Sequence, residues 1–171
     1  MKNLLILLAL LATACQSEHS GDAGAAVATD VAVNSKNTVV ITMEGKTHEL
    51  TDIDRENSKA ESGDGEVALE LVQSGNPVEL SFNLRDPGIR DTGAGEYVLP
   101  DANQGDVRIG LNFKDGSRRG IAMNQRIMFT TGTIRIQQLT DHSLKMTFEG
   151  TGHPMVDQKS FPIEGSIDIA F

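Results

Sequence analysis

Residues 66–85, EVALELVQSGNPVELSFNLR, decide the fold class of this chain. Apolar residues alternate with polar ones on both sides of a turn signal, Ser74-Gly75-Asn76-Pro77. The alternating apolar positions are Val67, Leu69 and Leu71 before the turn, and Val78, Leu80, Phe82 and Leu84 after it. A period of two places such side chains on one face of each strand. The segment therefore predicts an antiparallel hairpin with one buried and one solvated face.

The same period continues on both sides of this hairpin. Apolar residues alternate in the ranges 38–43, 46–50, 97–99, 107–113, 127–129, 134–136, 144–148 and 163–171. Glu44-Gly45-Lys46-Thr47 is typical of a tight hairpin turn. Leu139 leaves the register of the strand before it, which predicts a bulge near Gln137-Gln138. The Asp141-His142-Ser143 segment predicts a further turn between two strands.

Three other stretches lack a clear strand pattern. We expect a polar loop over 54–65 and a glycine-rich loop over 86–95, while Ile121 and Met123 continue the alternation only weakly. After residue 38 no helical period extends over ten or more residues. About ten short strands at a spacing of roughly 8–12 residues are typical of all-β domains. The sequence predicts a single antiparallel β-sandwich or small β-barrel over 38–171 and leaves the choice between the two open.

The charge distribution excludes one class of partner. The chain has a net charge of −9, and residues 16–84 alone carry 4 basic and 13 acidic residues. A nucleic-acid surface needs a basic footprint, so we expect no nucleic-acid partner. The adjacent pair Arg118-Arg119 follows a turn-like segment and is interpreted as part of a solvated loop.

The N-terminus has the order of a secretory signal. Lys2 supplies a positive charge, Leu4 to Ala12 form an apolar run of nine residues, and the small residues Thr13 and Ala14 precede Cys15. A helix that spans a bilayer needs roughly 17–25 residues, so the run is too short for a permanent transmembrane helix. Cys15 is the only cysteine of the chain, which excludes an intramolecular disulfide.

The segment Leu11-Ala12-Thr13-Ala14-Cys15 resembles the lipobox of bacterial lipoproteins. The resemblance implies a signal peptide at 1–14 and a mature chain that starts at Cys15, with lipid on its sulfur and an acyl group such as palmitate on its amine. The family prefers Leu three places before the cysteine, where this chain has Ala12. Because Gln16 is not Asp, the resemblance also implies the periplasmic leaflet of the outer membrane. The alternative is an ordinary secretory signal that is cut after Ala14 and leaves a free thiol.

Residues 15–37 are interpreted as a lipidated, flexible tether. The segment 16–37 has no aromatic residue and only three strongly apolar ones, Val27, Val31 and Val33. Such a segment buries too little apolar surface to offset its conformational entropy. A coil of this length has an end-to-end distance of about 25 Å. The alternative is that Val31 and Val33 begin a first strand.

The C-terminal segment, GTIRIQQLTDHSLKMTFEG followed by FPIEGSIDIAF, loosely resembles the ending of uncharacterised β-rich lipoproteins of Gram-negative bacteria. A Gly-led strand, a Phe-bearing strand and a closing strand recur there in this order. The resemblance implies a fold and no activity.

No residue pattern points to catalysis or to a cofactor. His19, His48, His142 and His153 have no second metal ligand at a recognisable spacing, and each is interpreted as a surface or turn histidine. No serine nucleophile signature occurs, and Cys15 lies at the proposed membrane end. We therefore expect no enzyme, no metal and no cofactor.

Two acidic loops are candidate calcium sites. One contains Asp52, Asp54, Glu56 and Asn57, and the other contains Asp101, Asn103, Gly105 and Asp106. An EF-hand loop needs Gly at its sixth position and Glu at its twelfth. Neither loop has Gly at the sixth position, so the sequence predicts no calcium site.

The sequence leaves three functions open. The first is a non-enzymatic envelope lipoprotein, anchored through Cys15, whose β-domain binds a protein or a polymer. The second is a carrier of a small apolar ligand in a barrel cavity. The third is an inhibitor of a basic envelope hydrolase, which the acidic half of the chain would attract.

Overall fold

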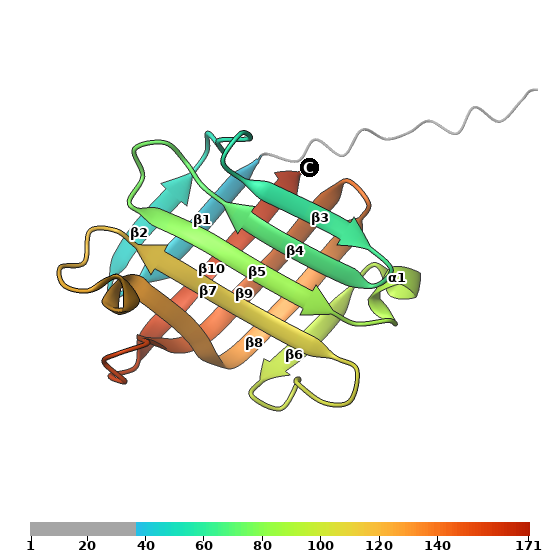
Figure 1. Cartoon of the computed structure of the whole chain (residues 1–171). Coiled ribbons are helices and arrows are strands. Elements are labelled where there is room, and N and C mark those ends of the chain that lie inside the picture. Colours follow the sequence, from blue (N-terminus) through green and yellow to red (C-terminus); the bar gives the residue numbers. More distant parts are fainter. Residues whose placement is uncertain (1–36) are drawn as a thin grey trace, which may run out of the picture. The chain divides into compact units, whose positions relative to one another are not determined.

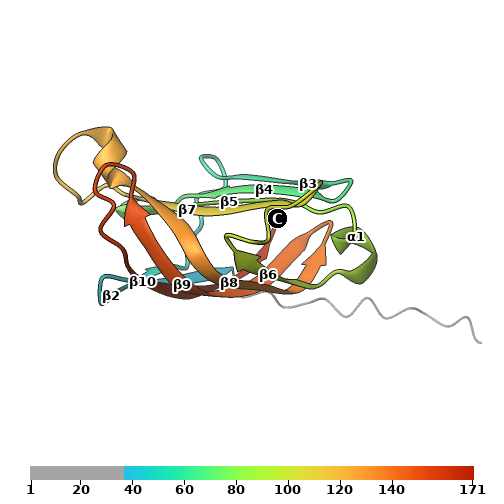
Figure 2. The ribbon, with the colours of Figure 1, turned by 90° about the horizontal axis from the view of Figure 1, so that it is seen from below.

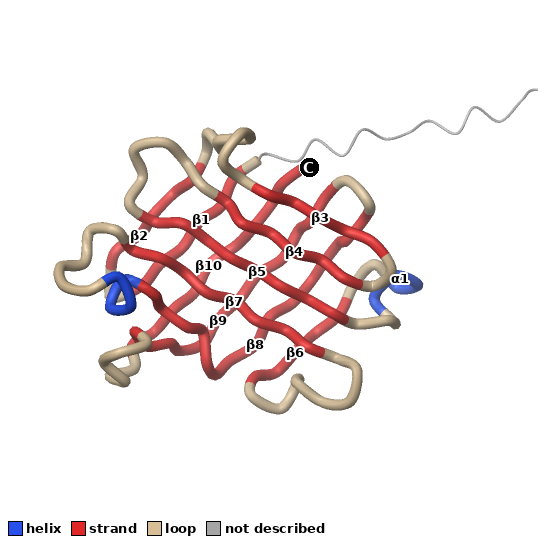
Figure 3. Tube along the Cα trace, in the orientation of Figure 1, coloured by secondary structure: helices blue, strands red, loops and turns tan. Residues whose placement is uncertain are grey.

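The computed structural model describes residues 37–171. The proposed signal peptide at 1–14, the lipid-attachment residue Cys15 and the tether up to residue 36 lie outside the described residues. Strand makes up most of the described chain, and helix occurs only in two four-residue segments (Figure 3). The strands are β1 (Thr38–Met43), β2 (Lys46–Leu50), β3 (Lys59–Gly63), β4 (Glu66–Leu71), β5 (Val78–Arg85), β6 (Gly95–Leu99), β7 (Arg108–Asp115), β8 (Arg126–Thr140), β9 (Ser143–Pro154) and β10 (Phe161–Ala170). The helices are α1 (Ile89–Thr92) and the 3₁₀ helix η1 (Ala122–Gln125).

All ten strands belong to one antiparallel sheet. The strand order is β2-β1-β10-β9-β8-β7-β5-β4-β3, and β6 pairs with β8 beside this path. The sheet curls over itself, so that β3, β4, β5 and β7 face β1, β2, β9 and β10 across the core (Figures 1 and 2). Within residues 37–171 the two edges, β2 and β3, do not pair with each other. The all-β prediction is confirmed, and the sheet is a curled half-barrel with an open seam.

Strand β8 forms the corner between the two layers. Its first residues pair with β7, whereas Gly132–Ile136 pair with β6. The register with β9 shifts between Phe129 and Thr131, and such a bulge bends a strand. Gly132 (φ 131°) and Gly150 lie at this bend, where a Cβ atom on Gly150 would be 2.0 Å from the carbonyl oxygen of Thr131. Both positions therefore require glycine because the two backbones approach closely.

The core lies between the layers and consists of the predicted alternating residues. The hairpin of β4 and β5 buries Val67, Leu69 and Leu71 on one strand and Val78, Leu80, Phe82 and Leu84 on the other, as predicted. Phe148 is at the centre of an aromatic group, with ring centroids 5.8 Å from Phe113 and 6.0 Å from Phe129. Gly165 faces the Phe148 ring, so the glycine gives the ring room within β10.

Two local predictions are confirmed. The tight turn after β1 consists of Glu44 and Gly45, with positive φ angles of 51° and 74° as a two-residue hairpin turn requires, while Lys46 and Thr47 of the predicted turn already belong to β2. The predicted bulge near Gln137-Gln138 is the second register shift of β8, between Ile136 and Gln138.

Several boundaries were predicted wrongly. The expected polar loop 54–65 contains β3, which the pattern missed because all five of its residues are exposed. The weak alternation at Ile121 and Met123 is no strand; it lies at η1, and both side chains are exposed. The strands are not all short, since β8 has 15 residues, β9 has 12 and β10 has 10.

The expected glycine-rich loop 86–95 contains α1 and is held from within the core. The hydroxyl of the buried Tyr97 donates to Asp86 Oδ2 at 2.8 Å, and Asp86 Oδ1 accepts from the Gly88 N–H at 2.8 Å. Burial, and then the bond to Asp86, raise the pKa of Tyr97 far above its ordinary value.

Candidate functional site

The open seam of the sheet contains a cleft of about 320 Å³, which we call the seam cleft. It is formed by the loop between β2 and β3 (residues 51–58), the first residues of β3, Leu71 of β4, the last residues of β10, and Asn37. The C-terminal end of the described chain lies between the two layers at this point (Figure 2). The cleft therefore brings together Asn37, residues 51–60, Leu71 and the chain end at 169–171.

The wall of the seam cleft is the loop 51–58, which is fixed to the end of β4. The Asp54 N–H donates to the Val72 carbonyl at 2.8 Å. The Ser58 hydroxyl accepts from the Val72 N–H at 3.0 Å and donates to its carbonyl oxygen at 3.3 Å, which extends the pairing of β3 with β4 by one step. The Thr51 N–H donates to the side chain of Gln73 at 3.0 Å. The loop thus connects β2 in one layer to β3 in the other and is held against the end of β4.

Asp54 shapes the inside of this loop. Its carboxylate accepts from the side chain of Asn57 at 2.7 Å and from the backbone N–H groups of Glu56 and Asn57 at 3.1 and 3.2 Å. These bonds, the Asn57 side-chain bond first, hold the pKa of Asp54 below its ordinary value of 3.8. The carboxylate of Asp54 serves the loop turn and is occupied by its N–H donors.

The floor of the cleft is apolar and its rim is polar. Leu71 and Ile169 are buried at the floor, and Ile53 and Phe171 are half-buried beside them. Asp52, Arg55 and Lys59 lie exposed along the rim. Such a mixture accommodates apolar side chains inside and polar or charged groups at the opening.

Strand β3 runs along the cleft with one unpaired edge. All five of its residues are exposed, and β4 is its only partner strand within the described chain. The backbone N–H and C=O groups of such an edge can pair with an added strand. Lys59 and Ala60 belong to both the edge and the cleft lining, so a strand that pairs with β3 would place side chains at the cleft.

The predicted candidate residues do not assemble into a catalytic or metal centre. His142 is exposed in the predicted turn, His48 is half-buried on β2, and His153 is the penultimate residue of β9 and not a loop residue as predicted. In the second acidic loop Asn103 accepts from the Ile109 N–H at 2.7 Å and so fixes the chain. Within residues 37–171 no group of three His, Cys, Asp or Glu side chains could hold a metal ion. His19 and Cys15 lie outside the described residues.

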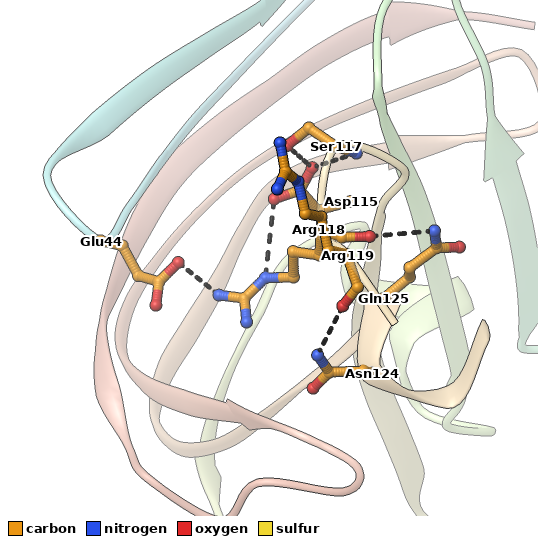
Figure 4. A network of polar contacts seen from close by, with 7 residues as sticks. All are labelled: Glu44, Asp115, Ser117, Arg118, Arg119, Asn124 and Gln125. Atoms are coloured by element: carbon orange, nitrogen blue, oxygen red, sulfur yellow. Dashed lines mark hydrogen bonds and ion pairs between the residues drawn. The ribbon is translucent and has the colours of Figure 1, made fainter. Parts of the chain in front are cut away.

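Arg118 was predicted to be solvated, and this is wrong. Its side chain is only 17% exposed and forms an ion pair with Glu44 of the β1–β2 turn (Figure 4). Its Nε lies 3.6 Å from Asp115, and its guanidinium lies 5.4 Å from the ring centroid of Phe161. The neighbouring Arg119 is exposed, as predicted. Arg118 therefore joins the loop after β7 to two other segments at the same end of the sheet.

Neither of the two helices in residues 37–171 has the length and apolarity needed to cross a membrane. Comparisons with protein-family models, with curated proteins and with solved structures found no match for this chain. The assignment of function therefore depends on the sequence and on the geometry of the seam cleft.

Proposed function

We propose that the chain is a membrane-anchored envelope lipoprotein whose non-enzymatic β-domain binds an extended segment of a partner protein at the seam cleft. The anchor is the lipidated Cys15 on the periplasmic leaflet of the outer membrane. The observation that carries the binding role is the position of the cleft beside the unpaired edge of β3. Backbone pairing to such an edge supplies affinity, and a pocket for alternate side chains supplies specificity.

The geometry of the cleft suits an extended peptide better than a flat surface of a partner protein. An added strand on β3 has alternate side chains on the cleft side, because side chains alternate along a strand. Leu71 and Ile169 offer one apolar contact, while Asp52, Arg55 and Lys59 offer charges of both signs at the rim. The apolar floor also favours a second candidate, a carrier of a small apolar ligand in the same cleft.

The anchor is tested by the intact mass of the purified chain and by fractionation. The proposal predicts a chain that starts at Cys15 with added acyl mass, and loss of membrane association in the Cys15→Ser chain. Two or more acyl chains give stable anchoring where one does not. An unacylated mass, or a Cys15→Ser chain that stays with the membrane, contradicts the anchor.

Peptide binding is tested by filling the cleft. Ala60→Phe adds a ring at the cleft, whereas the matched Val98→Phe adds one on the exposed side of β6. The proposal predicts that a partner co-purifies with the wild type and the Val98→Phe chain, and at least about tenfold less with Ala60→Phe, which corresponds to about 1.4 kcal/mol. Equal capture by both variants contradicts binding at the cleft. An acyl compound found in the purified wild type and absent from Ala60→Phe supports the carrier instead.

A further inference from the structure

Four of the large exposed apolar side chains gather at one end of the sheet. They are Ile121 (63% exposed), Met123 (51%), Met155 (38%) and Val156 (53%). The first two lie in the β7–β8 loop, and the other two lie in the β9–β10 loop. Both loops extend from the same end of the strands (Figures 1 and 2). We call these four residues, with the cations Arg119, Arg126 and Lys159, the loop-end surface.

The two loops are fixed against each other. The Met155 N–H donates to the carbonyl of Arg126 at 2.9 Å, which joins the second loop to the start of β8. Within the first loop the side chains of Asn124 and Gln125 donate to the carbonyls of Arg119 and Arg118 at 3.1 and 3.2 Å (Figure 4). These hydrogen bonds therefore fix the backbone of the loops that carry the exposed apolar side chains.

The loop-end surface is basic in an acidic domain. The two loops and the first residue of β8 (116–126 and 155–160) contain four basic residues and one acidic residue, Asp157, whereas the rest of 37–171 contains 9 basic and 20 acidic residues. Arg119, Arg126 and Lys159 are exposed and take part in none of the ion pairs of the described chain. Their positive charge is therefore available to an external anion.

We infer that the loop-end surface lies on a leaflet that contains anionic phospholipid and gives the domain a second membrane contact. Apolar side chains among Arg and Lys residues are the pattern of interfacial binding, in which the chains enter the acyl boundary and the cations meet phosphates. The inference rests on the proposed anchor at Cys15. A weak contact suffices in an anchored chain, because tethering makes the second contact intramolecular.

Single tryptophans test this inference directly, because the chain contains no tryptophan. Met123→Trp places the reporter in the loop-end surface, and Val98→Trp places it on β6 as the control. The full lipidated chains are reconstituted in vesicles of equal parts phosphatidylcholine and phosphatidylglycerol with brominated acyl chains. An interfacial side chain lies about 5–10 Å into the acyl boundary, so we expect about twofold stronger quenching for Met123→Trp than for Val98→Trp.

Charge reversal tests whether the cations of the loop-end surface contribute to the lipid contact. Arg119→Glu with Arg126→Glu, added to the Met123→Trp chain, should reduce quenching to the control level, as should vesicles of phosphatidylcholine alone. Arg108→Glu is the matched charge control, because Arg108 is exposed at the start of β7, the opposite end of that strand from the β7–β8 loop, and it should leave quenching unchanged.

The outcomes separate the inference from the anchor. Flotation of the vesicles in a density gradient reports whether the chains are anchored. Chains that float with the vesicles while both tryptophans are quenched equally contradict the inference but not the anchor. Chains that fail to float overturn the anchor, and the same reporters in the Cys15→Ser chain with excess vesicles then decide the inference. An unquenched loop-end surface that cross-links to a protein overturns the lipid assignment in favour of a protein partner.

Discussion

The replacement of Arg118 by methionine tests whether this side chain holds the β7–β8 loop to the β1–β2 turn and to β10. Arg118→Met removes the guanidinium but keeps an unbranched side chain over Phe161. The change removes the ion pair with Glu44, the charge interaction with Asp115 and the cation–π contact. It leaves Asp115 with the Ser117 N–H and hydroxyl, at 2.9 and 2.6 Å.

The expected loss of stability follows from these contacts. A cation–π contact contributes about 0.5–2 kcal/mol, depending on its exposure. An ion pair with a half-exposed partner such as Glu44 contributes about 0–1 kcal/mol because water screens it. The loss of the cation beside the buried Asp115 adds to these effects. We expect the free energy of unfolding to fall by about 2 kcal/mol, within the usual range for a buried polar contact.

Urea denaturation measures this change. With a slope of about 1–3 kcal/mol per M, the midpoint should fall by roughly 1 M. Lys114→Met is the matched control, since Lys114 pairs with Glu79 at 2.7 Å with both side chains more than a third exposed. That pair should contribute less than about 1 kcal/mol. Equal midpoints for the two variants would refute the role assigned to Arg118.

Three further outcomes are expected. Tyr97 is the single tyrosine, and its near-ultraviolet absorbance should show no tyrosinate at pH 10.0, which is the ordinary pKa of tyrosine. Because the pKa of Tyr97 is raised in the folded chain, its contribution to stability is present below pH 10.0 and falls as the pH rises above that value. Tyrosinate formation at pH 10.0 in the folded chain would contradict a buried Tyr97 that donates to Asp86. Gly165→Ala should lower the free energy of unfolding by about 1–3 kcal/mol, because the new Cβ atom would lie 2.2 Å from the Val40 carbonyl oxygen. Gly110→Ala is the control and should not lower it in this way, because no atom lies nearer than 3.8 Å to its Cβ position. Asp54 has a lowered pKa, so the pH titration of the Asn57 amide NMR signal should have its midpoint below 3.8. A midpoint at or above that value would contradict the hydrogen bonds assigned to the turn.

The alternating period predicted most of the sheet, because residues such as Val67 and Phe82 face the core in regular register. Strand β3 could not be predicted in this way, since an edge strand with five exposed residues has no apolar side to reveal it. The bend of β8 depends on the close approach of Gly132 and Gly150, which belong to different strands. Local patterns report burial well and report pairing between distant segments poorly.

Neither the seam cleft nor the role of Arg118 could be predicted from the sequence, because both depend on contacts between segments that are distant in the chain. Arg118 was assigned to solvent because its neighbours are turn residues, but its partner Glu44 lies 74 residues away in the sequence. The cleft needs the loop 51–58, β3 and the end of β10 at once. Asp52, Asp54 and Glu56 form an acidic pattern that is visible in the sequence, but the cleft is also lined by Ile53 and Leu71, which have no polar signature.

Photo-cross-linking in the native envelope tests the central claim, that the anchored β-domain binds a partner protein at the seam cleft. A photoreactive side chain at Ala60 reports on the cleft, and one at Val98 reports on the far side of β6. We expect one discrete protein adduct from position 60, no such adduct from position 98, and loss of the adduct in the Cys15→Ser chain. No protein adduct from position 60, or the same adduct from both positions, would contradict the account.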